Sequence, residues 1–483
     1  MRWALPARRG PGGREVSGIA AKDTRTPAPG PAAPGIAARR DRGIYAHMTA
    51  TEAAPRHPPE PEVPFDIGST EDSLERMCEL FARFGDIYRV YAPGRRSYTY
   101  VIHHPDDVKR VLVSNHRNYT KGIGLDRVKI LLGNGIMTSE GELWRRQRYM
   151  MQPCFHRRVI TKFARVIDEA NDRLIARWDA LAARGEPVNV TDDMSELTLD
   201  IVLRSIFGRD LERLSEQLGS NPFEVVTREQ ARNLQFAYKF RSLTRVVADL
   251  IRRRREEKEE HFDYVAMLMN ARDKDTGDAM SERQLIDEIM TLVVAGHETT
   301  AAGLNWTWYL LSQHPDVEAR LHAEIDATAE QPAPELAQME SLTYTSQVIS
   351  EALRLYPPGW VLSRRTIGPD VLCGYEIPPG TDILLSPYVI HRHPRYWEEP
   401  DAFRPERFAP EQEAQRPRYV YLPFAAGPRH CIGETFALYE MLMHLYKVAR
   451  RYRLRRVSTE PVQLEAQINL RPRQPIYMRL ERR

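Results

Sequence analysis

Cys431 lies in the short segment FAAGPRHCIG, residues 424–433, which also holds two glycines, an arginine and an aromatic ring. A free thiol titrates at about 8.5, and apolar surroundings raise its pKa further, so a thiolate needs a stabilising partner near neutral pH. A metal ion is such a partner, and the amides of the helix expected after Gly433 would also stabilise negative charge on sulfur. Gly427 and Gly433 permit turns that other residues resist. The segment predicts a loop built around a thiolate metal ligand.

A second segment places polar residues inside an apolar helix. The periodicity predicts a helix from about Glu282 to Ser312, and this helix contains AGHETT at residues 295–300. A glycine in a helix interior costs about 1 kcal/mol relative to alanine, and Glu298 and Thr299 stand where burial is expected. Such expense indicates function, although an exposed Glu298 and a Thr299 bonded back to a carbonyl would explain the same residues.

Arginines recur beside aromatic and acidic residues. Trp144 and Arg148 stand four positions apart on a predicted helix, where an indole and a guanidinium fork suit the carboxylates of a planar ring. A surface Arg148 beside a half-buried Trp144 is the plainer alternative. Glu351 and Arg354 form an i, i+3 pair, worth only a few tenths of a kcal/mol when solvated, and Arg407 follows further along the chain.

These motifs together resemble the cytochrome P450 family. The pattern F-x-x-G-x-R-x-C-x-G is similar to that family's haem-ligand loop, and A-G-x-E-T-T, W-x-x-x-R and E-x-x-R resemble its other motifs in the same order. The resemblance implies the cytochrome P450 fold, mainly α with small β-sheets (α+β), with a long central helix over haem b and the cysteine loop on the proximal side. A thiolate ligand is the haem arrangement that favours O–O cleavage. The implied protein is a soluble, bacterial-type haem-thiolate monooxygenase.

The resemblance also implies roles for individual residues. Cys431 would be the proximal iron ligand, with Phe424 packed near its sulfur. Gly296 would leave room above the haem, and Glu298 with Thr299 would form the acid–alcohol pair that relays protons to the oxygen being activated. The haem propionates would be bound by the side chains of Trp144, Arg148, Arg364 and Arg429.

Arg365 follows Arg364 directly, so the register of that propionate ligand is open by one residue. Glu351, Arg354 and Arg407 would form a Glu-Arg-Arg triad that fixes the loop leading into the cysteine. We interpret these three residues as structural, not catalytic.

Composition limits the class of protein. The 483 residues carry a formal net charge of +3, which demands no nucleic-acid partner. Four scattered cysteines and the lack of a long apolar run favour a reducing, cytoplasmic setting without a membrane anchor. Residues 1–63 are rich in Pro, Gly, Ala and Arg and are predicted to be a disordered extension, with Met48 as a possible true start. Residues 64–483 are predicted to form the haem domain.

The glycine-rich, apolar stretch at 121–140 is expected to line a pocket, under a roof from residues 208–262 that is shorter than the family usually has. An apolar substrate such as a fatty acid, terpene, steroid or polyketide suits these residues. The resemblance implies hydroxylation or epoxidation with O2, and electrons from NAD(P)H through a ferredoxin or flavodoxin-type donor and its reductase. The alternatives are a peroxide-using or isomerising relative and a non-catalytic haem-binding protein; the presence of Glu298 and Thr299 disfavours both.

Overall fold

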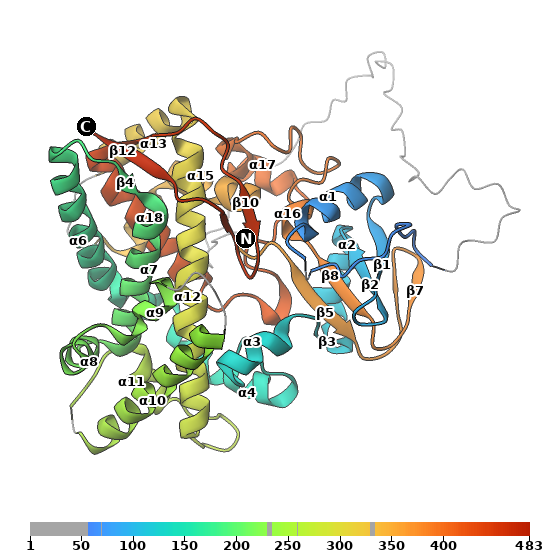
Figure 1. Cartoon of the computed structure of the whole chain (residues 1–483), viewed down its shortest axis with the longest axis horizontal. Coiled ribbons are helices and arrows are strands. Elements are labelled where there is room, and N and C mark those ends of the chain that lie inside the picture. Colours follow the sequence, from blue (N-terminus) through green and yellow to red (C-terminus); the bar gives the residue numbers. More distant parts are fainter. Residues whose placement is uncertain (1–56, 69, 229–233, 258, 329–333) are drawn as a thin grey trace, which may run out of the picture. The chain divides into compact units, whose positions relative to one another are not determined.

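The computed structural model describes residues 57–68, 70–228, 234–257, 259–328 and 334–483. Most of the predicted disordered extension, and Met48 with it, lies outside the described residues. Figure 1 shows most helices gathered around the long helix α12, beside a smaller part that holds the strands of the largest sheet. The mainly helical architecture with small sheets confirms the predicted fold class.

The helices begin and end as follows: α1 Ser73–Phe84, α2 Pro105–Lys109, α3 Leu125–Leu132, α4 Gly141–Met151, α5 Arg157–Ile160, α6 Ala164–Ala183, α7 Val190–Phe207, α8 Asp210–Leu218, α9 Val225–Arg228, α10 Leu234–Glu256, α11 Tyr264–Asn270, α12 Glu282–Leu311, α13 Pro315–Ala327, α14 Leu336–Ser341, α15 Thr343–Leu355, α16 Pro387–Ile390, α17 Pro410–Gln415 and α18 Glu434–Arg451. The strands are β1 Ile87–Ala92, β2 Ser97–Ile102, β3 Tyr119–Lys121, β4 Val188–Asn189, β5 Leu362–Thr366, β6 Asp370–Leu372, β7 Tyr375–Ile377, β8 Asp382–Leu385, β9 Tyr452–Arg456, β10 Leu464–Ala466, β11 Leu470–Pro472 and β12 Tyr477–Arg482.

The largest sheet brings distant parts of the chain together in the order β1-β2-β8-β5-β3. The hairpin of β1 and β2 is the strand pair that the alternating residues near positions 87–102 predict. Strand β8 adds to β2 in parallel, and β5 then pairs with β3 so that Lys121 lies opposite Arg364. This last pairing matters for the site, because it places two cations on neighbouring strands.

Helix α12 is the central helix that the sequence predicts. Its first turn is closed by a capping box, in which the Ser281 hydroxyl accepts from the Gln284 N–H and the Gln284 side chain accepts from the Ser281 N–H. Most of its residues are buried, because α7, α10, α15 and α18 all pack on it. A helix that is apolar on nearly every side belongs in the interior of a large domain.

Buried tryptophans tie the core together through their indole N–H groups. The Trp178 indole donates to Asp193, that of Trp306 to the Leu470 carbonyl at 3.0 Å and that of Trp308 to His444 at 2.9 Å. Buried Trp N–H groups need such partners. The Trp306 bond fastens the β10–β11 hairpin to α12. None of the helices within the described ranges is both long enough and apolar enough to cross a bilayer.

Candidate active site

The cysteine loop runs from Phe424 to the start of α18. The Cys431 N–H donates to the Phe424 carbonyl at 3.0 Å, which closes the loop around the thiol. Cys431 is accessible to solvent. The protein atoms packed around its sulfur nevertheless desolvate the thiol and raise its pKa. A backbone hydrogen bond from Gly433 and the positive charge of Arg148 act in the opposite direction and favour the thiolate. The loop therefore presents a sulfur whose ionisation a metal would complete.

The backbone of this loop requires glycine at position 427. Gly427 has φ +73°, and a Cβ there would lie 1.9 Å from the Leu112 carbonyl oxygen. Ala425 also adopts a positive φ, of 59°, which costs energy for any residue with a Cβ. The loop is thus pressed against the π-helical turn Arg110–Ser114 in a shape that its sequence makes specific.

The other cysteines differ from Cys431. Burial raises the pKa of Cys154 to about 11, and it also raises the pKa of Cys78. The Cys373 thiol donates to Asp107 at 2.7 Å, and burial beside that carboxylate raises its pKa as well. These three thiols are held in the neutral form, so we interpret them as structural.

Helix α4 brings Trp144 and Arg148 to the cysteine loop. The Arg429 guanidinium lies 3.9 Å above the Trp144 ring and donates to the Ser139 carbonyl at 2.9 Å. Arg148 donates to the His430 carbonyl at 2.8 Å. Four residues predicted from two separate motifs, among them Cys431, therefore meet in one place.

A cluster of buried and partly buried cations continues from Arg429. Arg364 is only 9 % exposed, and burial lowers its pKa to about 10. Burial, with the repulsion of Arg429 and Arg364, lowers the pKa of Lys121 to about 7. Arg365 points elsewhere and pairs with Asp382 at 2.9 Å. Strand alternation thus directs Arg364, and not Arg365, to the cluster.

This cation cluster, Lys121, Arg364 and Arg429, fits the two carboxylates of a haem. Glu140, which accepts from Arg429 at 2.6 Å, is the acidic group that the three cations share. Excess positive charge away from water is expensive unless anions compensate it. A dianionic ligand next to a thiolate-forming cysteine supplies that compensation, so the residues fit iron protoporphyrin IX.

Lys121 belongs to none of the sequence motifs. A single lysine carries no spacing signal, and its role depends on the β3–β5 pairing that sets it opposite Arg364. The glycine-rich stretch that begins at Lys121 was the only local hint.

The segment of α12 predicted to relay protons has its own contacts. Thr299 donates to the Ala295 carbonyl at 3.0 Å, and Glu298 is half-buried and accepts from the Asn469 amide at 2.9 Å. A Cβ at Gly296 would lie 2.8 Å from the Val202 side chain, so close packing on α7 already requires this glycine. Room above the haem at Gly296 stays a prediction.

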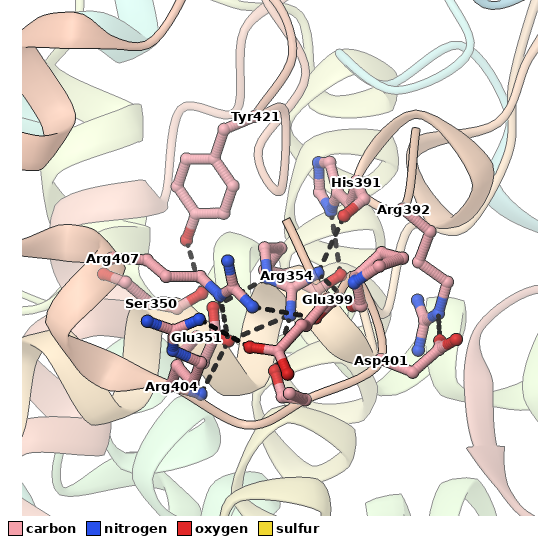
Figure 2. Close-up of polar contacts among 12 residues, drawn as sticks. Ser350, Glu351, Arg354, His391, Arg392, Glu399, Asp401, Arg404, Arg407 and Tyr421 are labelled. Carbon is pink, nitrogen blue, oxygen red and sulfur yellow. Dashed lines mark hydrogen bonds and ion pairs between the residues drawn. The ribbon is translucent and has the colours of Figure 1, made fainter. Parts of the chain in front are cut away.

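The predicted Glu-Arg-Arg triad is present and fully buried at its centre. Arg354 donates to both carboxylate oxygens of Glu351, at 2.7 and 2.9 Å, and Arg407 donates to the same carboxylate at 3.2 Å. Figure 2 shows these side chains converging with His391. The His391 ring meets the Arg354 carbonyl at 3.1 Å and accepts from the Leu422 N–H at 2.7 Å. The triad is therefore connected to the segment that leads into the cysteine loop.

Helix α12 also binds the stretch 121–140, which the sequence predicts to line the pocket. Asp287 accepts from the Asn134 N–H at 2.9 Å, and Glu288 accepts from the Ile136 N–H at 2.8 Å. Gly135 packs so closely on Thr291 that a Cβ would lie 2.1 Å from its hydroxyl. The loop before α4 is thus held in one position against the central helix.

Glu288 should make stability depend on pH. Burial raises its pKa from 4.5 to about 8, so between these values the unfolded chain releases a proton that the folded protein keeps. The free energy of unfolding therefore falls as pH rises through this window. Thermal unfolding of Glu288→Gln should show a weaker decline than the parent chain. The exposed Glu142→Gln is the control; equal declines in all three proteins would contradict the assignment.

The comparisons with known proteins agree with this geometry. The family profile described as Cytochrome P450 matches residues 64–480. The chain is 35% identical to cyclooctatin synthase of Streptomyces melanosporofaciens over 76% of this chain and 83% of that protein. It is 34% identical to protein LUTEIN DEFICIENT 5, chloroplastic, of Arabidopsis thaliana over 81% and 72% of the two chains.

A solved structure shares the same fold. The crystal structure of the cytochrome P450DA heme domain superposes with a TM-score of 0.77 at 25% identity and covers 88% of this chain and 98% of the other. The cysteine loop, the cation cluster, the central helix and the match over residues 64–480 lead to one conclusion. The chain belongs to the cytochrome P450 family.

Proposed function

We propose that the protein is a monooxygenase that binds haem b through Cys431. It inserts one oxygen atom of O2 into an apolar organic substrate and reduces the other atom to water with two electrons and two protons. The observation that carries this proposal is the Cys431 loop joined through Arg429 to the partly buried Lys121 and the buried Arg364. The bound haem supplies the activation of dioxygen. The protein holds the cofactor with Trp144, Arg148, Arg364, Arg429 and Phe424 around it.

The substrate we propose is a terpene-like hydrocarbon or its alcohol. Names among the relatives include pentalenene oxygenase, 31% identical, and cyclooctat-9-en-7-ol 5-monooxygenase, 32% identical. The stretch between Lys121 and Glu140 and the start of β5 carry apolar side chains such as Val128 and Leu362. Pentalenene, cyclooctat-9-en-7-ol and carotene form a suitable binding panel. If none of the three compounds shifts the haem spectrum, this substrate class is contradicted.

We assign the supply of electrons to a separate ferredoxin or flavodoxin-type donor, which its own reductase reduces with NAD(P)H. Arg145 is exposed on α4, next to the cysteine loop. Among the described residues its one ion-pair partner is Glu142, which is also exposed. Positive charge on the surface beside the cysteine loop can attract an acidic electron carrier. Reconstitution with each donor type tests this; reduction by neither would contradict the donor class.

Thr299→Ala should uncouple electron use from product formation. Thr299 follows Glu298 directly on α12, and the proposed relay uses the carboxyl and the hydroxyl of this pair to hold and pass a proton. We expect product per NAD(P)H to fall about tenfold or more, with peroxide released instead. Product, peroxide and NAD(P)H are measured together in the reconstituted system.

Thr307→Ala is the matched control for that variant. Thr307 lies on the same helix and donates to the Gly303 carbonyl at 2.7 Å, as Thr299 does to Ala295. The control should keep the parent's coupling. Full coupling in Thr299→Ala would refute the relay through this hydroxyl.

A further inference from the structure

The β10–β11 hairpin is hydrogen-bonded both to α12 and to residues 358–360. The Trp306 indole donates to the Leu470 carbonyl at 3.0 Å, and the Trp360 indole donates to the Gln467 carbonyl at 2.9 Å. The Leu470 N–H donates to the Pro358 carbonyl at 3.0 Å. Because these bonds come from two separate segments, α12 and residues 358–360, the hairpin has a defined position relative to the central helix.

This hairpin delivers one amide to the carboxylate of α12. The Asn469 Nδ2 group donates to Glu298 Oε2 at 2.9 Å, across 171 positions of sequence. A hydrogen bond to an ionised carboxylate is shorter and stronger than one between neutral groups. Asn469 therefore restricts the rotamers that the Glu298 side chain can adopt.

A cavity with a mixed polar and apolar lining, called the polar cavity for its polar groups, lies beside this contact. It has a volume of about 100 Å³, and both Glu298 and Asn469 line it, together with residues of α7, α9, α12 and β11. Space of this size, with several polar groups around it, can hold ordered water molecules. Its other lining residues include two that can exchange protons, Asp192 and His297, and the polar residues Ser195, Thr227, Asn305 and Arg471.

We infer that Asn469 is a positioning residue for proton delivery. It holds the Glu298 carboxylate at the edge of the polar cavity, so that a proton taken from water there passes to Glu298 and on toward Thr299. This inference rests on the proposed monooxygenase function, in which each oxygen molecule consumes two protons. Asn469 itself neither gains nor loses a proton.

Asn469→Asp tests the hydrogen bond with little change in shape, because an acceptor replaces the donating amide. In the haem-loaded enzyme with its electron donor and pentalenene as probe, we expect product per NAD(P)H to fall about tenfold. The solvent deuterium isotope effect on product formation should rise, while the carbon-monoxide spectrum and the affinity for pentalenene stay unchanged. A purely structural residue would not alter the isotope effect.

Gln474→Glu is the matched control. It makes the same amide-to-carboxylate change near the same hairpin, where Gln474 is exposed and pairs with Gln463 at 3.0 Å. This variant should couple as the parent does. Equal isotope effects in the parent, Asn469→Asp and Gln474→Glu would overturn the inference, even when the parent forms product and the proposed function holds.

A second readout does not depend on activity. In the double variant Glu298→Gln with Asn469→Asp, the amide and the carboxylate are exchanged, so the hydrogen bond can form in the reverse direction. Each single variant should lower the melting temperature, and the double variant should recover most of the loss without regaining coupling. If the two single-variant losses of melting temperature simply add in the double variant, the two side chains do not interact, and the inference is overturned. A parent enzyme that forms no product from O2 would instead contradict the proposed function, whatever the melting temperatures.

Discussion

Cys431→Ser is expected to abolish the long-wavelength carbon-monoxide band and all O2-dependent product formation. A serine hydroxyl does not ionise near neutral pH, so the variant loses the thiolate that favours O–O cleavage. The backbone bond from Cys431 to Phe424 involves only main-chain atoms and should persist, which keeps the loop in place. The reduced carbon-monoxide difference spectrum, the haem content and the far-ultraviolet circular dichroism are measured on the same preparation.

Cys154→Ser is the matched control for this prediction. Cys154 is a buried thiol in the turn after α4, and burial holds it in the neutral form. The control should keep the band and the product. A Cys431→Ser protein that retains both the fold and the long-wavelength band would show that another residue binds the iron.

Arg354→Met is expected to cause the largest loss of stability. Removing one partner of a buried ion pair costs about 3–5 kcal/mol, because the other charge stays buried without compensation. Arg354 also donates to the carbonyls of His391, Pro400 and Ala402, at 2.8, 2.7 and 3.1 Å, and all three lose this donor. Denaturant unfolding should show a large drop in the midpoint, and haem should dissociate more readily.

Arg404→Ala is the matched control, drawn in Figure 2 beside the triad. The Arg404 guanidinium pairs with Glu399 at 2.7 Å on the surface, and exposed pairs contribute at most about 1 kcal/mol. The Arg404 N–H that donates to Glu351 stays in this variant. Similar losses in both arginine variants would contradict a special role for the buried pair.

The sequence predicts the parts of the site whose chemistry depends on local spacing. The frame around Cys431 and the four-residue step from Trp144 to Arg148 each identify a short segment, and the structure brings both segments together. The long helix around Glu298 is also predicted, because apolar residues continue over its whole length. The fold class is implied by the family resemblance that these motifs carry.

Contacts between distant segments could not be predicted. Lys121 joins the cation cluster only through the β3–β5 register, and Asn469 reaches Glu298 only because Trp306 and Trp360 fix the hairpin. Neither residue stands in a motif. Tertiary packing also explains Gly296, because the nearest obstacle to a Cβ there is Val202 of α7.

The arginine at position 364 illustrates a choice that the structure narrows. The sequence favours Arg364 but leaves its register open by one residue, because Arg365 follows directly. In strand β5 the two side chains point to opposite faces, so Arg365 reaches Asp382 and Arg364 reaches the buried cations. Binding of a propionate by Arg364 stays a prediction for a haem-loaded structure to test.

The reduced carbon-monoxide difference spectrum of the haem-loaded parent protein tests the central claim most directly. Thiolate ligation by Cys431 predicts the long-wavelength Soret band that gives the cytochrome P450 family its name. A band only at clearly shorter wavelength, from a protein that is folded and fully loaded with haem, would contradict it.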